Sequence, residues 1–224
     1  MTKTLNDEKL VSVSMYPEKI IAYNWYHKEM LPGSLPDVYV REGVYEALLR
    51  AAESLPSQLR LIVWDGYRTY QLQSYLYECL FSRIKATGLS DEDANKKTSI
   101  YVAYPSKDDE NVSFHLTGGA VDVTLADNEG HYLPMGGDFD DTEERSRTDY
   151  YDNADYGFKN GDKVTPSMMA CWNRRTLKRV MTEAGFCNYS EEFWHYSFYD
   201  RNWAKEKGYS GEVYHYIEPA YKWR

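Results

Sequence analysis

Apolar residues recur at helical spacing in three stretches of the chain. Over residues 40–55 they fall on one face, which predicts an amphipathic helix that ends before Pro56. Over 69–85 leucines and an isoleucine repeat with helical spacing and predict a second helix. A third is predicted over 165–184, because a threonine suited to capping precedes a proline at the first helical position.

Other stretches have the patterns of strands and of a long loop. The apolar run 59–64 is typical of a buried strand that ends in a turn at Asp65 and Gly66. Over 120–125 apolar and polar residues alternate, so Asp122 is expected on the face opposite the aliphatic side chains. A short strand is predicted over 194–198. The stretch 127–162 is rich in Gly, Asp and Asn, and we interpret it as a long surface loop with a functional role.

Length and composition favour one domain. The chain has 224 residues, of which 42% are hydrophobic, enough to bury a sizeable core. We expect a single domain over residues 1–224, in which residues 1–40 form a less certain N-terminal extension.

Charge and cysteine content exclude several classes of protein. The net charge is −9 and the basic residues are scattered, so no nucleic-acid partner is expected. No stretch approaches the roughly 18 apolar residues of a membrane span, and charges near the N-terminus argue against a secretory signal. The cysteines show no C-x-x-C spacing and are odd in number, which argues against a disulfide framework. We expect a soluble, cytoplasmic protein.

Two short motifs contain the residues of a hydrolytic zinc site. His115 and Asp122 are seven positions apart, which would place them on opposite faces of an uninterrupted strand. They converge only if the chain turns between them, as Gly118 and Gly119 allow. Some seventy residues later, Glu192 and His195 are three apart, so a turn directs both to one point. Two imidazoles, a ligating carboxylate and a second carboxylate as base are the minimum set for such a site.

Arg68 adds a cation at the junction of the buried strand and the second helix. A guanidinium stays charged and can stabilise the oxyanion that forms when water attacks an amide. Taken singly, each candidate also has an ordinary structural interpretation: a hydrogen-bonded histidine, a turn carboxylate, a solvated glutamate, a surface ion pair. The chain also lacks the H-E-x-x-H helix of the commonest metalloproteases.

An ordered set of motifs separates these interpretations. Over roughly residues 40–200 the chain resembles the D-alanyl-D-alanine dipeptidases, the VanX-like zinc enzymes of the M15 metallopeptidase type. The resemblance rests on Trp64-Asp-Gly-Tyr-Arg68, Ser113-x-His-x-x-Gly-x-Ala-x-Asp122, Met135-Gly-Gly-Asp-Phe-Asp140, Glu144-Arg-Ser146, Asn173-Arg-Arg175, Gly185-Phe186 and Glu192-x-Trp-His-Tyr196.

The resemblance implies a fold, a cofactor and a reaction. The fold would be α+β, with a central antiparallel sheet and helices packed to one side. One zinc ion per chain would take part in hydrolysis of the free dipeptide D-Ala-D-Ala during cell-wall precursor metabolism.

It also implies a role for each matched residue. The zinc ligands are His115, Asp122 and His195, the base is Glu192 and the carbonyl-polarising group is Arg68. For the substrate, Asp140 holds the amino terminus and Ser113 lies near the carboxylate, to which we add Tyr23 from the poorly matching N-terminal region.

Two departures from the family pattern affect the expected pocket. Phe193 replaces a tryptophan, a change that should keep base and ligand in place but reshape the pocket wall. Phe114 stands where a second serine can occur, so contacts of that side chain would be lost.

Two other functions are compatible with the sequence. A D,D-carboxypeptidase that trims longer peptidoglycan peptides would need an open cleft. A non-catalytic zinc-bearing binding domain would not need the base and arginine that are present here. The sequence leaves open assembly into a homo-oligomer.

Overall fold

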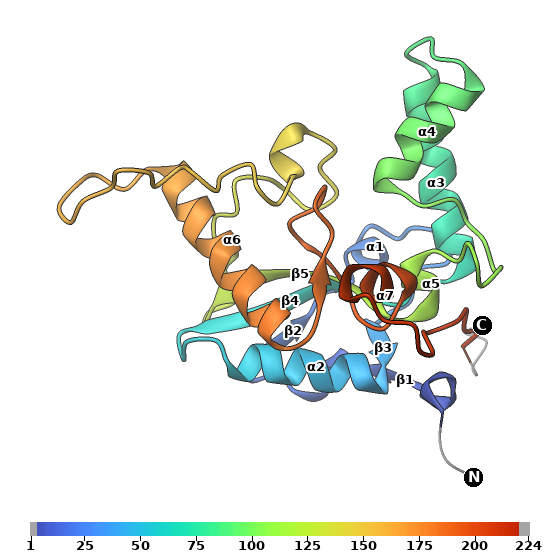
Figure 1. Cartoon of the computed structure of the whole chain (residues 1–224), viewed down its shortest axis with the longest axis horizontal. Coiled ribbons are helices and arrows are strands. Elements are labelled where there is room, and N and C mark those ends of the chain that lie inside the picture. The colour runs from blue at the N-terminus through green and yellow to red at the C-terminus, as the bar shows by residue number, and fades with distance from the viewer. Residues whose placement is uncertain (1–3, 220–224) are drawn as a thin grey trace.

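A five-stranded sheet forms the centre of the molecule, and its middle strand carries Asp122 (Figure 1). The computed structural model describes residues 4–219. The strand order is β2-β4-β5-β7-β6, formed by Ile20–Ala22, Leu59–Asp65, Ala120–Asp127, His195–Ser197 and Cys187–Asn188. The α+β class is confirmed, but the sheet is mixed, because β2 runs parallel to β4 while the other pairs are antiparallel.

Two helices cover one face of this sheet. Helix α2, Glu42–Glu53, and helix α6, Pro166–Glu183, lie side by side there (Figure 1). Their buried residues join Val121, Val123 and Leu125 of β5 in one core cluster. The first predicted helix begins at Glu42 rather than at residue 40, because β3, Tyr39–Arg41, pairs with β1, Leu10–Ser12.

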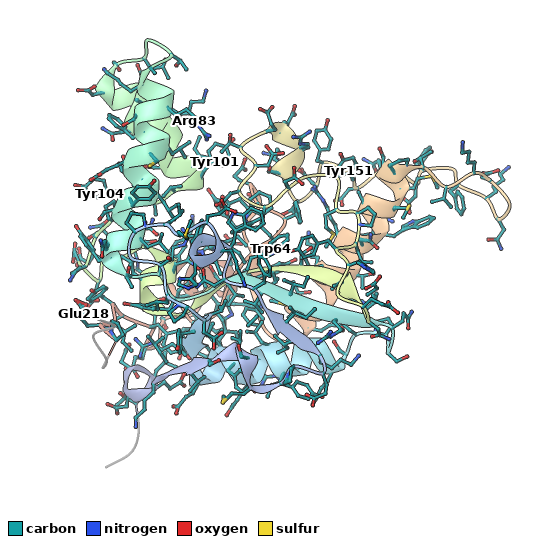
Figure 2. The ribbon with its side chains drawn as sticks, turned by 180° about the vertical axis from the view of Figure 1, so that it is seen from behind. Trp64, Arg83, Tyr101, Tyr104, Tyr151 and Glu218 are labelled. Atoms are coloured by element: carbon teal, nitrogen blue, oxygen red, sulfur yellow. The ribbon has the colours of Figure 1, made fainter. Side chains whose placement is uncertain are left out.

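A second helical pair stands away from the sheet. Helix α3, Tyr70–Lys85, follows β4 as predicted, and α4, Asp91–Tyr101, packs antiparallel to it (Figure 1). Figure 2 shows Arg83 and Tyr101 on this pair, and Trp64 over the sheet. Leu80, Ile84 and Ala94 form a small core cluster between the two helices. The helices are therefore not all on one side of the sheet.

Short elements complete the fold. They are η1 Leu5–Asp7, η2 Val13–Met15, α1 Trp25–Lys28, α5 Phe114–Thr117, η3 Glu144–Ser146 and α7 Arg201–Lys207. Over the described residues, no helix is long and apolar enough to cross a membrane. Past the end of β5 at Asp127, the loop up to residue 162 contains η3 and a single β-bridge at Tyr132, but it is not confined to the surface, since Met135 and Phe139 are buried in the core.

Described segments near the two ends of the chain, over 6–8 and 215–217, meet beside α5. Arg41 is almost completely buried, and its guanidinium donates hydrogen bonds to four backbone carbonyls. The acceptors are Asn6 at 3.2 Å, Glu8 at 2.8 Å, Thr117 at 2.8 Å and His215 at 3.0 Å. Farther along the chain, the Ile217 N–H donates to the Leu116 carbonyl of α5 at 3.3 Å. The N-terminal and C-terminal segments therefore both support α5.

Candidate metal centre

Three side chains from separate elements converge beside the sheet. His115 comes from α5, Asp122 from β5, and His195 from β7, where it is the register partner of Asp122. His195 Nδ1 lies 3.0 Å from Asp122 Oδ1 and 3.3 Å from His115 Nε2. His115 Nε2 lies 3.4 Å from Asp122 Oδ2. All three side chains are buried, and one ligand atom from each lies within 4.8 Å of the others, close enough to hold one metal ion.

The two glycines between His115 and Asp122 make this convergence possible. Gly118 ends α5 with φ of 73°, in the left-handed region. A Cβ on Gly118 would lie 2.8 Å from Leu10 Cδ2, and one on Gly119 would lie 2.8 Å from the Phe198 carbonyl. The predicted turn is therefore present, and the packing around it leaves no room for a larger residue.

Hydrogen bonds and burial leave the imidazoles ready to bind a cation. His115 Nδ1 donates to the Gly66 carbonyl at 2.7 Å, so its Nε2 lone pair faces the cluster. Burial lowers the pKa of His195, which favours the neutral ring that metals bind. Although burial opposes it, the neighbouring His115 and His195 lower the pKa of Asp122, so this carboxylate is ionised.

The donor set fits zinc. Two neutral imidazole nitrogens and one carboxylate oxygen provide three protein ligands, the number found in catalytic zinc sites that keep a position open. The backbone carbonyl behind His115 supplies the outer support such ligands usually have.

Glu192 lies next to the cluster in the turn that precedes β7. Its Oε2 is 3.8 Å from His195 Nδ1. The Asn188 side-chain amide donates to the carbonyls of both Glu192 and His195, at 3.1 and 3.0 Å, and so fixes the turn. Burial, reinforced by the charges of Asp122 and Asp140, raises the pKa of Glu192 well above its usual value. In this environment the protonated, neutral form of the carboxyl group is favoured, so Glu192 is suited to accept a proton as a general base.

Arg68 is buried on the other side of Asp122. Its Nη2 donates to Asp122 Oδ2 at 3.2 Å, and its Nε donates to Asp65 Oδ2 at 2.5 Å. Burial would lower the pKa of Arg68, but the surrounding acidic groups, Tyr26 and Asp65 foremost, raise it well above its usual value. The guanidinium is therefore charged and held in place.

A β-bulge explains how Asp65 reaches this group. The register of β4 on β5 runs from Val63 opposite Val123 to Asp65 opposite Asp122, so Trp64 is an extra residue. In a bulge, two residues of one strand lie opposite one residue of the partner strand. The side chains of Trp64 and Asp65 can therefore both lie on the face of the sheet that carries Asp122. Asp65 Oδ2 lies 3.5 Å from His115 Nδ1 as well as beside Arg68.

Asp140, from the long loop, lies beside the same cluster of Arg68 and its partners. Tyr26, on α1, donates its hydroxyl proton to Asp140 Oδ2 at 2.7 Å and accepts a bond from Arg68 Nη2 at 3.2 Å. Asp140 has φ of 59°, a conformation uncommon for residues other than glycine. Asp140 is exposed as a whole residue, but loss of hydration around its carboxyl group, where it meets Tyr26, raises its pKa to about 6. The loop thus presents one carboxylate, in an unusual backbone conformation, next to the candidate metal centre.

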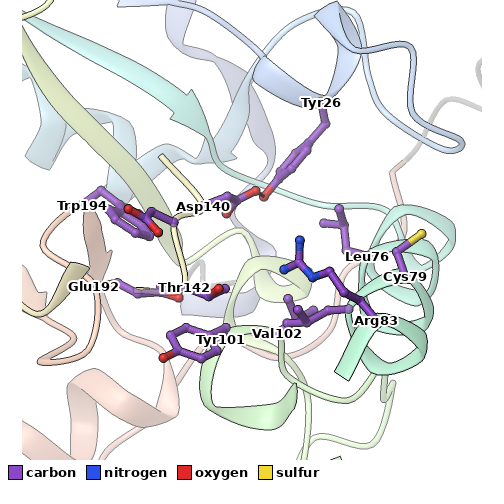
Figure 3. A pocket seen from close by; sticks show the side chains of 12 residues that line it. Tyr26, Leu76, Cys79, Arg83, Tyr101, Val102, Asp140, Thr142, Glu192 and Trp194 are labelled. Atoms are coloured by element: carbon purple, nitrogen blue, oxygen red, sulfur yellow. Dashed lines mark hydrogen bonds between the residues drawn. The ribbon is translucent and has the colours of Figure 1, made fainter. Parts of the chain in front are cut away.

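Two adjoining hollows give access to these residues. One, of about 300 Å³, is lined by His115 and His195 of the metal centre together with Ser113 and Phe114, whereas Asp122 lies behind them. The other, of about 360 Å³, extends between α3 and the long loop, and Figure 3 shows Arg83 and Tyr101 in its wall together with Glu192 and Asp140. Both hollows share Asp140 and Glu192 in their walls, so together they form one cleft.

The remaining sequence-based candidates lie in different places. Ser113 is buried at the start of α5 and lines the smaller hollow. Tyr23 does not line the cleft; its backbone N–H pairs with β4, and Tyr26, three residues later, occupies the site instead. Phe193 is also outside the cleft, in the core under the Arg174 guanidinium at 3.9 Å, so the expected change in pocket wall is not seen.

Two residues beside the metal centre, Tyr26 and Asp65, were not predicted from the sequence. Asp65 stood inside the motif that ends at Arg68, but its side-chain direction depends on the bulge, which the alternation of residues does not predict. For Tyr26 the signal was the cluster of aromatic residues over 23–26. A helix of four residues is too short to show which of these aromatic side chains faces the site.

Known proteins with similar sequences share one description. The peptidase M15 family, described as D-ala-D-ala dipeptidase, matches residues 37–217. A D-alanyl-D-alanine dipeptidase of Synechocystis sp. is 31% identical over 74% of this chain and 71% of that protein. One from Enterococcus faecium is 30% identical over 70% of this chain and 73% of that protein.

A solved structure also aligns with the chain. It is VanYB in complex with D-Alanine-D-Alanine, with a TM-score of 0.44, 20% sequence identity and coverage of 77% of this chain and 80% of that one. The assignment rests on the sequence matches, because they extend over most of the chain. The chain belongs to the D-ala-D-ala dipeptidase family of M15 peptidases.

Proposed function

We propose that the protein is a zinc-dependent dipeptidase that hydrolyses D-Ala-D-Ala to two molecules of D-alanine. The observation that carries the proposal is the convergence of His115, Asp122 and His195, with Glu192 and Arg68 on either side, at a cleft that these side chains line except for the buried Asp122. One zinc ion per chain would be held by the first three. Zinc bound there would act as a Lewis acid toward the peptide carbonyl and lower the pKa of water.

The other residues supply proton transfer and charge stabilisation. Glu192 takes a proton from the attacking water and returns it to the leaving amine. The raised pKa of its carboxyl group in this buried position supports that role. Arg68 donates a hydrogen bond to the carbonyl oxygen as negative charge develops on it. Asp65 keeps the guanidinium in place through the bond to Nε.

Recognition of a free dipeptide requires opposite charges at its two ends. We assign the ammonium group to Asp140, whose carboxylate faces the cleft beside Tyr26, and the carboxylate to the region of Ser113. A substrate held at both termini is a dipeptide rather than an internal segment of a protein. We assign Tyr26 rather than Tyr23 to this pocket, since Tyr26 lines the cleft.

Trimming of longer peptides is the second candidate, and one observation favours it. The cleft continues past Asp140 into the larger hollow, where Arg83 lies. A peptide extended at its amino end would have space there. Rates with D-Ala-D-Ala and with a pentapeptide ending in D-Ala-D-Ala separate the two candidates.

The base assignment has a direct test. Glu192→Gln should keep its zinc, measured by metal analysis, but lose about 10²- to 10⁴-fold in kcat, because the amide cannot take up the proton. Glu191→Gln is the matched control, since Glu191 is adjacent but pairs with Arg147 at 3.1 Å. Near-normal turnover by Glu192→Gln would refute the assignment, and absence of zinc and of chelator-sensitive activity in the parent protein would refute the proposed function.

A cytoplasmic location is part of the proposal. The three cysteines are unpaired, as is usual in a reducing compartment. Fractionation of cells that produce the protein would test the location.

A further inference from the structure

An aromatic-lined hollow lies over the sheet beyond the active-site cleft. It encloses about 620 Å³, and we call it the aromatic cavity. Its walls include the rings of Trp25, Trp64, Tyr132 and Phe139, together with the side chain of Thr124. Figure 2 shows Trp64 in this part of the molecule. Phe139 precedes Asp140, so the cavity borders the loop that enters the active site, but it shares none of the proposed metal ligands.

Two polar atoms in the wall of this cavity have no protein partner. Among the described residues, Trp64 Nε1 and Thr124 Oγ1 are buried without a hydrogen bond. The register of the two strands accounts for their placement: Val63 pairs with Val123, and Trp64 and Thr124 each follow one of these residues along neighbouring strands. Because successive side chains of a strand point to opposite faces, Trp64 and Thr124 both lie on the face of the sheet opposite to the two valines. Buried polar groups normally have partners, so these two atoms indicate a missing one.

The chemistry of the two atoms restricts the ligand. An indole N–H only donates, whereas a hydroxyl both donates and accepts. A secondary amide complements the pair, because its carbonyl accepts from Trp64 and its N–H donates to Thr124. A carboxylate is disfavoured at this depth, because the cation in the cavity wall, Arg145, is half exposed and its Nε already pairs with Asp141 at 2.5 Å.

The rings around the pair favour a ligand with apolar surface next to the amide. Tyr132 meets Trp64 edge-on, with ring centroids 5.8 Å apart, and is itself 49% exposed. Both polar atoms are buried, so a ligand must displace a side chain of the wall to reach them, and the exposed Tyr132, which contacts Trp64, is the side chain that we expect to move.

We propose that the aromatic cavity is a second binding site, specific for a neutral secondary amide flanked by apolar groups. Such an amide occurs in a peptide backbone and in the N-acetyl group of an amino sugar. In the complex, Trp64 Nε1–H donates to the amide carbonyl and Thr124 Oγ accepts from the amide N–H. Binding requires no turnover, so the proposal stands or falls separately from the dipeptidase reaction.

The test is a titration of the zinc-loaded protein followed by the NMR signals of the tryptophan indole N–H groups. One probe is N-acetyl-D-alanine N-methylamide, a peptide amide without charged ends; the second is N-acetylglucosamine, with glucose as the sugar that lacks an amide. Trp64→Phe assigns the Trp64 signal. We expect that signal to shift and saturate with at least one amide probe and to stay in place with glucose.

Thr124→Val is the decisive variant, because it keeps the shape and removes only the hydroxyl. It should weaken binding about fivefold, the effect of one hydrogen bond. It should not lower the melting temperature, since the hydroxyl has no protein partner to lose. Thr182→Val, on the exposed side of α6, is the control and should bind like the parent.

The probe that binds identifies the source of the amide. A response to the peptide amide alone assigns a peptide ligand, and a response to N-acetylglucosamine alone assigns an amino sugar. No shift of the Trp64 signal with either probe, or unchanged affinity in Thr124→Val, would overturn the proposal.

Discussion

Replacing Arg41 by methionine should destabilise the protein far more than a change at an ordinary surface arginine. Arg41 is 1% exposed and donates to the carbonyls of Asn6, Glu8, Thr117 and His215. Its guanidinium also lies over the Tyr214 ring at 5.1 Å. Methionine keeps the unbranched stem of the side chain but removes the guanidinium, and so leaves four acceptors without their donor.

The magnitude follows from those four bonds. At about 1 kcal/mol net for each, the free energy of unfolding falls by about 4 kcal/mol. Part of this is offset because methionine removes a charge whose burial lowers the pKa of Arg41. A net loss of about 2 to 4 kcal/mol lowers the melting temperature of a chain of this size by about 4 to 16 °C.

Thermal melting with and without zinc is the assay, and Arg50→Met is the control. Arg50 is exposed and donates to one carbonyl, that of Ala184 at 3.2 Å, so its loss should cost less than about 1 kcal/mol. Because Arg41 supports α5, its variant should also release zinc to a chelator faster than the control. Equal melting temperatures and equal zinc release for the two variants would show that the four bonds contribute no net stability.

Three further predictions concern pH and metal. Loss of hydration around its carboxyl group raises the pKa of Asp140 to about 6. KM for the dipeptide should therefore rise as pH falls through 6, and Asp140→Asn should have a high KM that does not change there. Burial also raises the pKa of Asp200 to about 6, so the folded state binds the proton more tightly than the unfolded state; stability should increase as pH falls from about 6 toward 4, and melting of Asp200→Asn should lack that component. Zinc at a hundredfold excess over its Kd should raise the melting temperature by about 5 to 11 °C, and Asp122→Asn should lose this rise, as titration calorimetry or melting can measure.

The sequence predicts best those elements whose local signals and packing agree. Helix α6 begins at the predicted Thr165 cap, whose side chain accepts from the Met168 N–H, and α3 begins at the corresponding Thr69 cap. Helix α4 was missed because only Ala94 and Thr98 of it are buried, so its apolar pattern is faint. The strands β1, β2 and β3 have three residues each, too few for alternation to be recognised.

The candidate site was predictable where a short motif fixes its own geometry. His115 and Asp122 converge because the glycines between them allow one turn, and that requirement is visible in the sequence. The neighbours of Arg68 were not predictable, since Asp65 depends on a bulge and Tyr26 on the orientation of a four-residue helix. Both depend on tertiary contacts between segments far apart in the chain.

The bulge at Trp64 has a consequence for any transfer of this site to another scaffold. In a regular strand, residues 64 and 65 would face opposite sides of the sheet. A redesign that copied the motif from Trp64 to Arg68 onto an ideal strand would turn either the indole or the Asp65 carboxylate into the layer beneath α2 and α6. The spacing of this motif therefore encodes a shift of register, and a graft must carry the irregularity along with the residues.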